Sequence, residues 1–467
     1  MDRYGPPVNA HACTPASAPL RATIRPPGSK SITNRALIVA ALAEGTSVLA
    51  GALLADDTWL MIEALRTLGI SITVDESTRV LEVTGSRGFL PAESANVYCG
   101  NAGTVMRFGT ALCALGQGRY ELDGSARMRR RPIGALVDAL RTLQCPVEYG
   151  QEEGFPPLVL HARGLRGGKL DFHGLESSQF LSALLMVAPY AQGDLFIEAS
   201  SLTPSLPYVE MSLKVMEAFG VIVVADFGRC LSSKGSAKED AEGQSARTTA
   251  AIALPHRFIV ETPQRYQARA YSIEPDASAA TYFLAAAAVA GGSVTVEGIG
   301  SESIQGDAAF VDILELMGCN VDREPDHLTI HGPPAGVALR GIDVDLNAMP
   351  DTVLTLSVLA LFADGPTTIR NVANLRVKES NRLSALRREL TKLGAEVEER
   401  EDGLTIHPPV RLQSATIDTY DDHRMAMSFA LAGLRSEGVV IRNPDCCDKT
   451  FPGFFDCFDR MTTAPAA

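Results

Sequence analysis

Residues 276–297 read DASAATYFLAAAAVAGGSVTVE, and the fold prediction begins from this segment. It opens with small and polar residues, continues as an apolar run, reaches Gly292 and ends in β-branched residues. This order predicts a helix, a turn at the glycine and a strand, because glycine takes the left-handed conformation without a Cβ clash.

The same pattern occurs six times along the chain. Each copy has a polar start, a long apolar run, and a glycine sixteen residues after the start, followed by a short β-rich segment. The chain is therefore an internally repeated α/β protein. The six glycines are Gly45, Gly116, Gly193, Gly292, Gly365 and Gly438.

A second helix and a hairpin complete most copies, so that one unit is predicted to be helix, strand, helix, hairpin. Second helices end in sequences such as EALRTLG at 63–69 and ELTKLG at 389–394. The sixth unit stops at its second helix, near Phe458 to Met461. We expect Leu20 to Arg25 to supply its missing strand, which would bring both termini into one domain.

The spacing of the units predicts two domains. Because 467 residues exceed one ordinary domain, we expect three units in each: residues 29–274 in one, and residues 1–28 with 275–467 in the other. One interval between glycines, of 99 residues, is longer than the others, and the excess falls near 232–251. That small and polar segment is predicted to be a mobile inserted loop.

Composition restricts the class of protein. A formal net charge of −13 disfavours nucleic acid and acidic membranes as partners, so an anion site has to be built from local cations. The sequence contains no apolar run long enough to predict a membrane helix. The first twenty residues lack the patterns of signal and transit peptides, and we predict that they form a loose tail. Nine scattered cysteines without a Cys-x-x-Cys favour free thiols in a reducing compartment, the cytoplasm, and no metal site is predicted.

Polar residues gather at the six predicted helix starts, which read GSKS, GNAGT, SSQ, DAS, MPD and DDHR. Free backbone N–H groups and a partial positive charge make helix N-termini suitable for phosphates and carboxylates. A threefold arrangement in each domain would point three starts at a common centre. Two facing domains would give a cleft lined by six.

The first start combines a point charge at Lys30, a hydroxyl at Ser31 and a guanidinium at Arg35, one turn later on the same helix face. An anion cradle and a well-capped helix with a solvated lysine are both compatible with it. The other motifs also have ordinary explanations: N-capping by Ser177 or Asp351, a solvated basic loop at 127–132, and an exposed ion-paired helix around Arg382. Their recurrence at one phase of the repeat favours function.

Ten ordered motifs resemble the 3-phosphoshikimate 1-carboxyvinyltransferase (EPSP synthase) family of enolpyruvyl transferases, from about Arg25 to Phe455. They are PPGSKSITNRAL, GNAGTVMR, RMRRRPIGALVDALR, ESSQFLSALLMVAP, PDASAATYFLAAA, QGD, MPDTVLTLSVLALF, NLRVKESNRL, YDDHRMAMSFAL and KTFPGFF. The resemblance implies two inside-out α/β barrel domains around a hinged cleft, with phosphoenolpyruvate and shikimate 3-phosphate as small-molecule substrates and no cofactor.

The resemblance also implies roles for individual residues. The acid–base candidates are Lys30, Asp351 and Glu379. The shikimate 3-phosphate contacts are Lys30, Ser31, Arg35, Ser177, Ser178, Gln179, Ser205, Tyr208, Asp351, Asn374 and Lys378. The phosphoenolpyruvate contacts are Lys30, Asn101, Gly103, Arg131, Gln179, Arg382, Arg424 and Lys449.

Two residues depart from the family pattern near the predicted site. Phe108 stands where the family usually has proline, which puts the shape of the phosphoenolpyruvate pocket and the response to the inhibitor glyphosate in question. Asn381 stands where aspartate is common, which removes a possible ion pair with Arg382.

Two alternative functions share part of this sequence pattern. The sister enzyme that acts on UDP-N-acetylglucosamine usually has a reactive cysteine in the loop matching Asp123 to Arg131, and this loop has none. A non-catalytic scaffold would be expected to have lost its charged residues at the helix starts, and they are present. We expect a monomer, because the repeats can close their own cores.

Overall fold

The computed structural model describes residues 9–200, 204–227, 256–334 and 336–463. The predicted insertion at 232–251 lies outside the described residues. Within the described part, no helix is both long enough and apolar enough to span a membrane.

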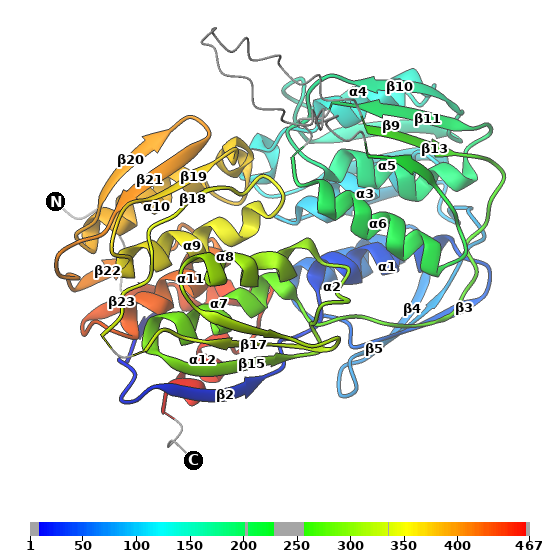
Figure 1. The fold of residues 1–467 in the computed structure, drawn as a ribbon. Coiled ribbons are helices and arrows are strands. Elements are labelled where there is room, and N and C mark those ends of the chain that lie inside the picture. The colour runs from blue at the N-terminus through cyan, green and yellow to red at the C-terminus, as the bar shows by residue number, and fades with distance from the viewer. Residues whose placement is uncertain (1–8, 201–203, 228–255, 335, 464–467) are drawn as a thin grey trace, which may run out of the picture.

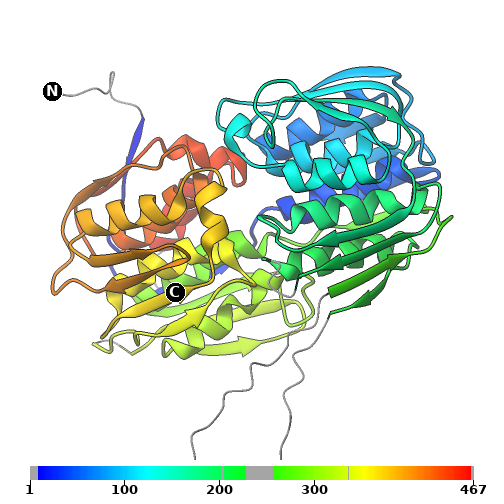
Figure 2. The ribbon, with the colours of Figure 1, turned by 90° about the horizontal axis from the view of Figure 1, so that it is seen from above.

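Two lobes, each with its own hydrophobic core, make up the structure (Figures 1 and 2). We call residues 30–273 the first lobe and residues 9–24 with 277–463 the second lobe. In both, the long helices pack together in the interior and the sheets lie outside them, which confirms the predicted inside-out α/β arrangement.

Each unit builds one small sheet, and the second unit shows the pattern. A parallel strand, β6, precedes helix α3. Strand β7 follows that helix, and after α4 the hairpin β8–β9 returns antiparallel to β7. The predicted unit lacked the strand before each first helix. In the first lobe the elements are α1 (Lys30–Leu42), β3 (Thr46–Ala50), α2 (Asp56–Thr67), β4 (Ser71–Asp75), β5 (Val80–Thr84), β6 (Ser94–Tyr98), α3 (Gly103–Cys113), β7 (Gln117–Asp123), η1 (Met128–Arg130), α4 (Gly134–Thr142), β8 (Val147–Tyr149), β9 (Leu158–Arg163), β10 (Gly168–Phe172), α5 (Gln179–Val187), η2 (Ala188–Tyr190), β11 (Leu195–Ala199), α6 (Leu206–Ala218), β12 (Val224–Asp226), β13 (His256–Val260) and β14 (Ala270–Ser272).

The second lobe repeats this pattern. Its described elements form two four-stranded sheets and one three-stranded sheet. They are β1 (Ala10–Ala12), β2 (Leu20–Ile24), α7 (Ala277–Ala290), β15 (Gly292–Glu297), η3 (Gly306–Ala309), α8 (Phe310–Leu316), β16 (Asn320–Arg323), β17 (His327–His331), β18 (Asp343–Asp345), η4 (Pro350–Thr352), α9 (Val353–Leu359), η5 (Ala360–Phe362), β19 (Thr367–Arg370), η6 (Ala373–Val377), α10 (Arg382–Lys392), β20 (Glu396–Arg400), β21 (Gly403–His407), β22 (Ala415–Ile417), α11 (His423–Gly433), β23 (Val439–Arg442), η7 (Pro444–Lys449) and α12 (Phe454–Thr463).

The two lobes exchange one strand each. Strand β2 precedes α1 in the chain but pairs in parallel with β15 of the second lobe, while β14 precedes α7 but pairs in parallel with β3 of the first. The two crossing segments run side by side, because the Ser29 N–H donates to the Glu274 carbonyl at 2.8 Å and the Asp276 N–H donates to the Pro27 carbonyl at 2.8 Å. The lobes are therefore joined by a paired double connection.

The prediction for the sixth unit was wrong in its partner strand. Residues Leu20–Ile24 complete the fourth unit, and Ala10–Ala12 pairs antiparallel with β23 of the sixth. The exposed edge of β23 offers backbone donors and acceptors that a short strand satisfies, and His11 packs on Phe455 with ring centroids 4.3 Å apart. Residues 10–12, expected to lie in a loose tail, are thus part of the fold.

The repeat glycines serve more than one purpose. Gly45, Gly292 and Gly438 have positive φ, as predicted. Gly116, Gly193 and Gly365 do not, so the prediction was wrong for them. At Gly116 the position is crowded: an added Cβ would lie 2.2 Å from the Tyr120 hydroxyl.

Candidate active site

A polar cavity lies between the lobes, at the N-terminal ends of several helices. Its first-lobe wall comes from the starts of α1, α2, α3, α5 and α6 and from Arg131 after η1. Its second-lobe wall comes from η4, the segment before α10, and α11. It is lined by Lys30, Ser31, Arg35, Asp57, Gly103, Thr104, Arg131, Ser177, Ser178, Gln179, Ser205, Tyr208, Asp351, Lys378, Glu379 and Arg424.

The cavity is positively charged in a negatively charged chain. Five cationic side chains line it against the three carboxylates of Asp57, Asp351 and Glu379. A cation excess in a partly dehydrated cleft concentrates field lines and attracts anions. The cavity therefore fits a ligand that carries several negative charges.

Arg35 is the clearest unneutralised charge in the first-lobe wall. Its side chain is 1% exposed, and no carboxylate of the described residues lies within ion-pair distance of it. Burial lowers the pKa of this guanidinium to about 10. A buried cation without a counter-ion is costly, so an anionic ligand at this position would be stabilising.

Asp351 organises the second-lobe wall. Its carboxylate lies 2.9 Å from Arg424, 3.0 Å from Arg382 and 3.8 Å from Lys378. Burial alone would raise the pKa of Asp351, but these three cations, Arg424 foremost, hold it well below its usual value. Asp351 is therefore ionised and can accept a proton or a hydroxyl hydrogen bond.

Glu379 joins the two lobes. Its carboxylate lies 3.1 Å from Arg382 and 3.4 Å from Lys449 of its own lobe, and 4.0 Å from Arg131 of the first lobe. Burial opposes ionisation, yet Lys449, Arg382 and Arg131 hold the pKa of Glu379 well below its usual value. Any ligand anion that takes over these cations will raise that pKa.

Four of the predicted site residues do not line this cavity. Arg382 lies behind it, 1% exposed, where it links Asp351, Glu379 and Asp422. Lys449 and Asn101 line an adjoining hollow, and the Lys449 ammonium donates to the Asn101 carbonyl at 3.3 Å. Asn374 lies on the outer side, with its amide donating to Ser205 Oγ at 3.4 Å.

Sequence reasoning missed several charged residues in and around the cavity. Asp57 is 3% exposed and pairs with Lys30 at 3.1 Å and Lys449 at 3.8 Å. Its position in the first turn of α2 is typical of an ordinary acidic helix start. Only its contacts with Lys30 and Lys449, which lie far from it in the sequence, distinguish Asp57 from such a residue.

Arg127 and Asp307 were missed for a similar reason. The Arg127 guanidinium donates across the lobes to the carbonyls of Lys378, at 2.6 Å, and Glu379, at 3.0 Å. Asp307 lies in the quoted QGD motif, and its carboxylate accepts hydrogen bonds from Ser278 and, across the lobes, from the Tyr208 hydroxyl at 3.1 Å. Burial and Asp351 raise the pKa of Asp307 to about 6.

The two departures from the family pattern have definite places. Phe108 is fully buried in α3 and is not part of the cavity lining. Asn381 is the N-cap of α10, and its side-chain oxygen accepts from the Ser384 N–H at 3.3 Å. Arg382 has Asp351, Glu379 and Asp422 as partners without it.

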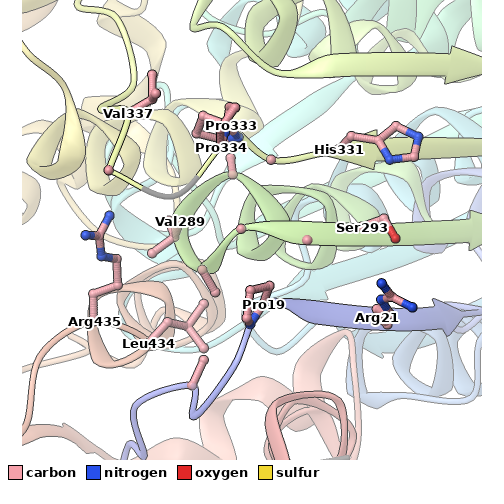
Figure 3. Close-up of a pocket in the computed structure, with 17 residues that line it drawn as sticks. Pro19, Arg21, Val289, Ser293, His331, Pro333, Pro334, Val337, Leu434 and Arg435 are labelled. Carbon is pink, nitrogen blue, oxygen red and sulfur yellow. The ribbon is translucent and has the colours of Figure 1, made fainter. Parts of the chain in front are cut away.

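A larger hollow, of about 660 Å³, lies on the second lobe beside β2 and the C-terminal end of α7 (Figure 3). Its cations, Arg21 and Arg435, are exposed, and the remaining lining is mainly Gly, Pro and apolar residues. It lacks the buried, convergent charges of the interlobe cavity, so size alone does not make it the site.

The interlobe cavity is closed. Its free volume is about 50 Å³, which is room for one or two water molecules. Cross-lobe hydrogen bonds, such as Ser205 N–H to the Asn347 carbonyl at 3.0 Å, hold it in this state. A substrate of ordinary size can enter only when the lobes separate.

These observations define the class: an α/β protein with two repeat-built lobes and a cation-rich cavity between helix N-termini. A family model described as EPSP synthase (3-phosphoshikimate 1-carboxyvinyltransferase) matches residues 15–247 and 248–458. The chain is 45% identical to a 3-phosphoshikimate 1-carboxyvinyltransferase of Sulfurovum sp., over 94% of this chain and 96% of that protein. It is 46% identical to a chloroplastic one of Arabidopsis thaliana, over 94% of this chain and 82% of that protein.

A solved structure shows the same fold. EPSP synthase from Acinetobacter baumannii superposes with a TM-score of 0.74 at 24% identity, covering 96% of this chain and 97% of that one. The chain belongs to the EPSP synthase (3-phosphoshikimate 1-carboxyvinyltransferase) family.

Proposed function

We propose that this enzyme transfers the carboxyvinyl group of phosphoenolpyruvate to the 5-hydroxyl of shikimate 3-phosphate, giving 5-enolpyruvylshikimate 3-phosphate and phosphate. The cation excess of the closed interlobe cavity is the observation that supports it most directly. Both substrates are small, multiply charged anions, which a cation-rich cavity suits. Membership of the EPSP synthase family supports the same assignment.

The two substrates are assigned to different groups of residues in and around the cavity. Shikimate 3-phosphate is assigned to the serines at the starts of α5 and α6, to Ser31, and to the uncompensated Arg35. Phosphoenolpyruvate is assigned to the cations that surround Glu379, namely Arg131, Arg382 and Lys449, with Arg424 beside them. Guanidinium groups suit its phosphate and carboxylate because their fork matches both geometries.

The reaction proceeds by addition and then elimination. The 5-hydroxyl oxygen bonds to C2 of phosphoenolpyruvate while C3 gains a proton, which gives a tetrahedral ketal phosphate. Phosphate then leaves from C2 and C3 loses a proton, which restores the double bond. Asp351, held ionised, takes the hydroxyl proton, and Glu379 with Lys30 exchanges protons at C3 and with the leaving phosphate.

Substrate binding prepares Glu379 for its role as an acid. In the ligand-free cavity, three cations keep it ionised, so it has no proton to give. When the phosphate and carboxylate of phosphoenolpyruvate occupy those cations, the pKa of Glu379 rises toward the range useful for proton transfer. Closure of the lobes excludes water and strengthens each of these interactions.

The sister reaction on UDP-N-acetylglucosamine is not favoured. The relatives that match this chain are named for the shikimate reaction. Cys113, the cysteine closest in sequence to the loop at 123–131, is fully buried at the end of α3. A UDP-sugar acceptor would need a cysteine on the cavity side of that loop if it follows the pattern of that enzyme.

We also propose that the protein is a cytoplasmic monomer. Each lobe closes its own hydrophobic core, and the eight cysteines within the described residues are free thiols, which suits a reducing compartment. Light scattering coupled to size exclusion, with and without substrates, tests the oligomeric state.

Product identification tests the proposed function. Purified protein mixed with phosphoenolpyruvate and shikimate 3-phosphate should yield a new compound that carries the carboxyvinyl ether at the 5-oxygen, detected by proton NMR. Arg131→Gln should raise the KM for phosphoenolpyruvate about tenfold or more, because one buried charge-assisted contact is lost. A wild-type protein that forms no ether would refute the assignment.

A further inference from the structure

A seam between α1 and α3 joins the two substrate regions. The Asn34 amide of α1 donates to Thr104 Oγ1 of α3 at 2.7 Å. One residue later, the Arg35 guanidinium carbon lies over the Phe108 ring, 5.3 Å from its centroid. Both contacts lie within the first two turns of helices whose starts line the cavity.

The hydrogen bonds of Arg35 leave one N–H for a ligand. Nε donates to Ser212 Oγ at 2.7 Å, and Nη2 donates to the Tyr208 carbonyl at 2.9 Å and to Ser182 Oγ at 3.4 Å. Nη1 donates to the Ser31 carbonyl at 2.9 Å. A guanidinium has five N–H donors in one plane. Within the described residues, the one donor of Arg35 that has no acceptor is therefore on Nη1. The orientation of the guanidinium plane decides where this N–H points.

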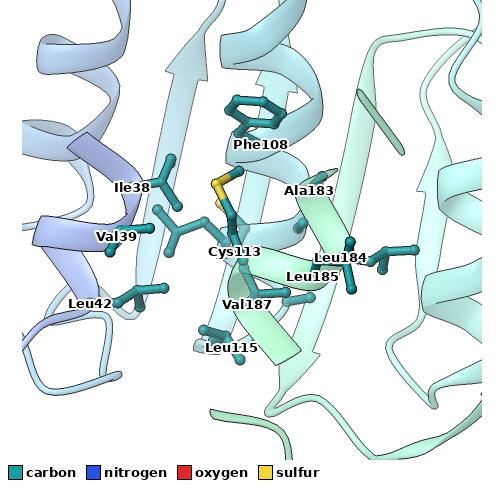
Figure 4. Close-up of a cluster of buried hydrophobic side chains, with 14 of the residues drawn as sticks. Ile38, Val39, Leu42, Phe108, Cys113, Leu115, Ala183, Leu184, Leu185 and Val187 are labelled. Atoms are coloured by element: carbon teal, nitrogen blue, oxygen red, sulfur yellow. The ribbon is translucent and has the colours of Figure 1, made fainter. Parts of the chain in front are cut away.

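The ring of Phe108 lies against that guanidinium, with the guanidinium carbon 5.3 Å from the ring centroid. It lies in α3 beside apolar side chains of α1 and α5, such as Ile38 and Ala183 (Figure 4), and is fully buried. An aromatic ring within about 6 Å of a guanidinium attracts the cation through its quadrupole. Leucine would fill much of the same space but has no π face.

We propose that Phe108 is a positioning residue for the acceptor substrate. Its ring fixes the plane of Arg35 and excludes water where the two groups meet, so that the free Nη1–H is directed at the anion of shikimate 3-phosphate. The inference rests on the proposed function, and it differs from the expectation that Phe108 shapes the phosphoenolpyruvate pocket. Phe108 acts through Arg35 and does not touch substrate.

The test compares Phe108→Leu with Phe258→Leu, the same change at a fully buried phenylalanine of β13 that does not contact Arg35. Calorimetry measures the Kd of shikimate 3-phosphate, and steady-state kinetics measures the KM for phosphoenolpyruvate and kcat. We expect Phe108→Leu to raise the Kd about 2- to 30-fold, the range of cation–π contacts from exposed to desolvated ones. The KM for phosphoenolpyruvate and kcat should stay within about twofold, and Phe258→Leu should leave the Kd unchanged.

A second background separates positioning from general loosening of the fold. In Arg35→Lys, which lacks the planar fork, Phe108→Leu should weaken shikimate 3-phosphate no further. An unchanged Kd in Phe108→Leu, an effect that persists in Arg35→Lys, or a rise in the KM for phosphoenolpyruvate alone would overturn the proposal. A wild-type protein that binds no shikimate 3-phosphate would overturn the proposed function and this inference together, whereas normal turnover with a Phe108-independent Kd would overturn only the inference.

Discussion

At the scale of single residues, the candidate site contains buried charged groups that their neighbours do not neutralise one for one. Glu379 is held ionised by nearby cations although it is buried, and Arg35 is buried with no carboxylate partner among the described residues. Both conditions are costly in the free protein. Under the proposed function, substrate anions offset this cost, so that binding free energy prepares Glu379 as an acid and orients the acceptor.

Glu379→Gln should lower kcat by roughly 10²- to 10⁴-fold, because the amide cannot deliver a proton to C3. The KM for phosphoenolpyruvate should not rise, since Lys449 and Arg382 lose a competing carboxylate. Phosphate release under saturating substrates measures kcat, with exposed Glu398→Gln in β20 as the control. Activity of Glu379→Gln within tenfold of wild type would remove Glu379 from the chemistry.

Asp307 gives a prediction about pH. Its pKa in the folded protein is about 6 against 3.8 for an ordinary Asp, so the folded state binds the extra proton between those values. Stability therefore falls as pH rises through that window, by ~3 kcal/mol for a shift of about two units. Asp307→Asn lacks this penalty, so its thermal midpoint relative to wild type should increase from pH 4 to pH 7.

Asp138→Asn, at an exposed position of α4, is the matched control for that comparison and should track wild type at every pH. Parallel midpoint curves for Asp307→Asn and wild type would show that Asp307 titrates normally.

Prediction from sequence brought together residues that lie in the quoted motifs. Fourteen of the predicted site residues line one cavity. Some of them, such as Ser31 and Ser178, stand at helix starts that the repeat pattern reveals, whereas others, such as Ser205 and Tyr208, were predicted only through the family resemblance. Asp57, Asp307 and Arg127 were missed, although the last two lie in quoted motifs, because their contacts are with residues far away in the chain, such as Lys449 and the carbonyl of Lys378.

At the scale of elements, capped helix starts position the site. Ser29, Asp276 and Asp422 cap α1, α7 and α11 with side-chain oxygens, which fixes where each helix begins. An N-cap satisfies one of the unpaired N–H groups of the first turn. Of these three helices, α1 and α11 begin at the cavity wall, so the partial positive charge of their N-termini adds to its potential.

Asn381 at the start of α10 should act as a cap and nothing more. Asn381→Ala should lower the unfolding free energy by ~1 kcal/mol, and Asn381→Asp should keep it, since both Asn and Asp cap well. Differential scanning calorimetry measures the difference, and kcat should be unchanged in either variant. A large loss of activity in Asn381→Ala with no loss of stability would contradict a capping role.

Strand partners were the weakest part of the prediction. The hydrophobic pattern identified the segment Leu20 to Arg25 as a strand but gave no register, and the structure pairs it with β15. Strand β1 is three residues, Ala10–Ala12, too short to show an alternating pattern. Edge pairing depends on which sheet edge is free, and this is decided only when the units assemble.

At the scale of the whole molecule, two lobes close over a cavity that neither can form alone. We propose that the lobes are domains that fold around separate cores, with residues 1–28 and 275–467 in one and residues 29–274 in the other. The paired connection at 25–29 and 273–276 would let them separate without breaking either core. Substrate entry requires that separation, because the closed cavity is too small.

Removal of residues 1–13 tests the contribution of β1 to the second lobe. The deletion loses the pairing with β23 and the contact of His11 with Phe455, which together should lower the unfolding free energy by ~2 kcal/mol. Thermal unfolding measures it against a chain that begins at Asn9, and kcat should be unchanged because β1 is remote from the cavity. Equal midpoints for the two chains would show that β1 adds no stability.

The most direct test of the central claim is phosphate release from phosphoenolpyruvate by the full-length protein, with shikimate 3-phosphate or UDP-N-acetylglucosamine as acceptor. We expect release only with shikimate 3-phosphate, with one phosphate released for each acceptor consumed. Release with the UDP-sugar alone, or none with either acceptor in a folded protein, would contradict it.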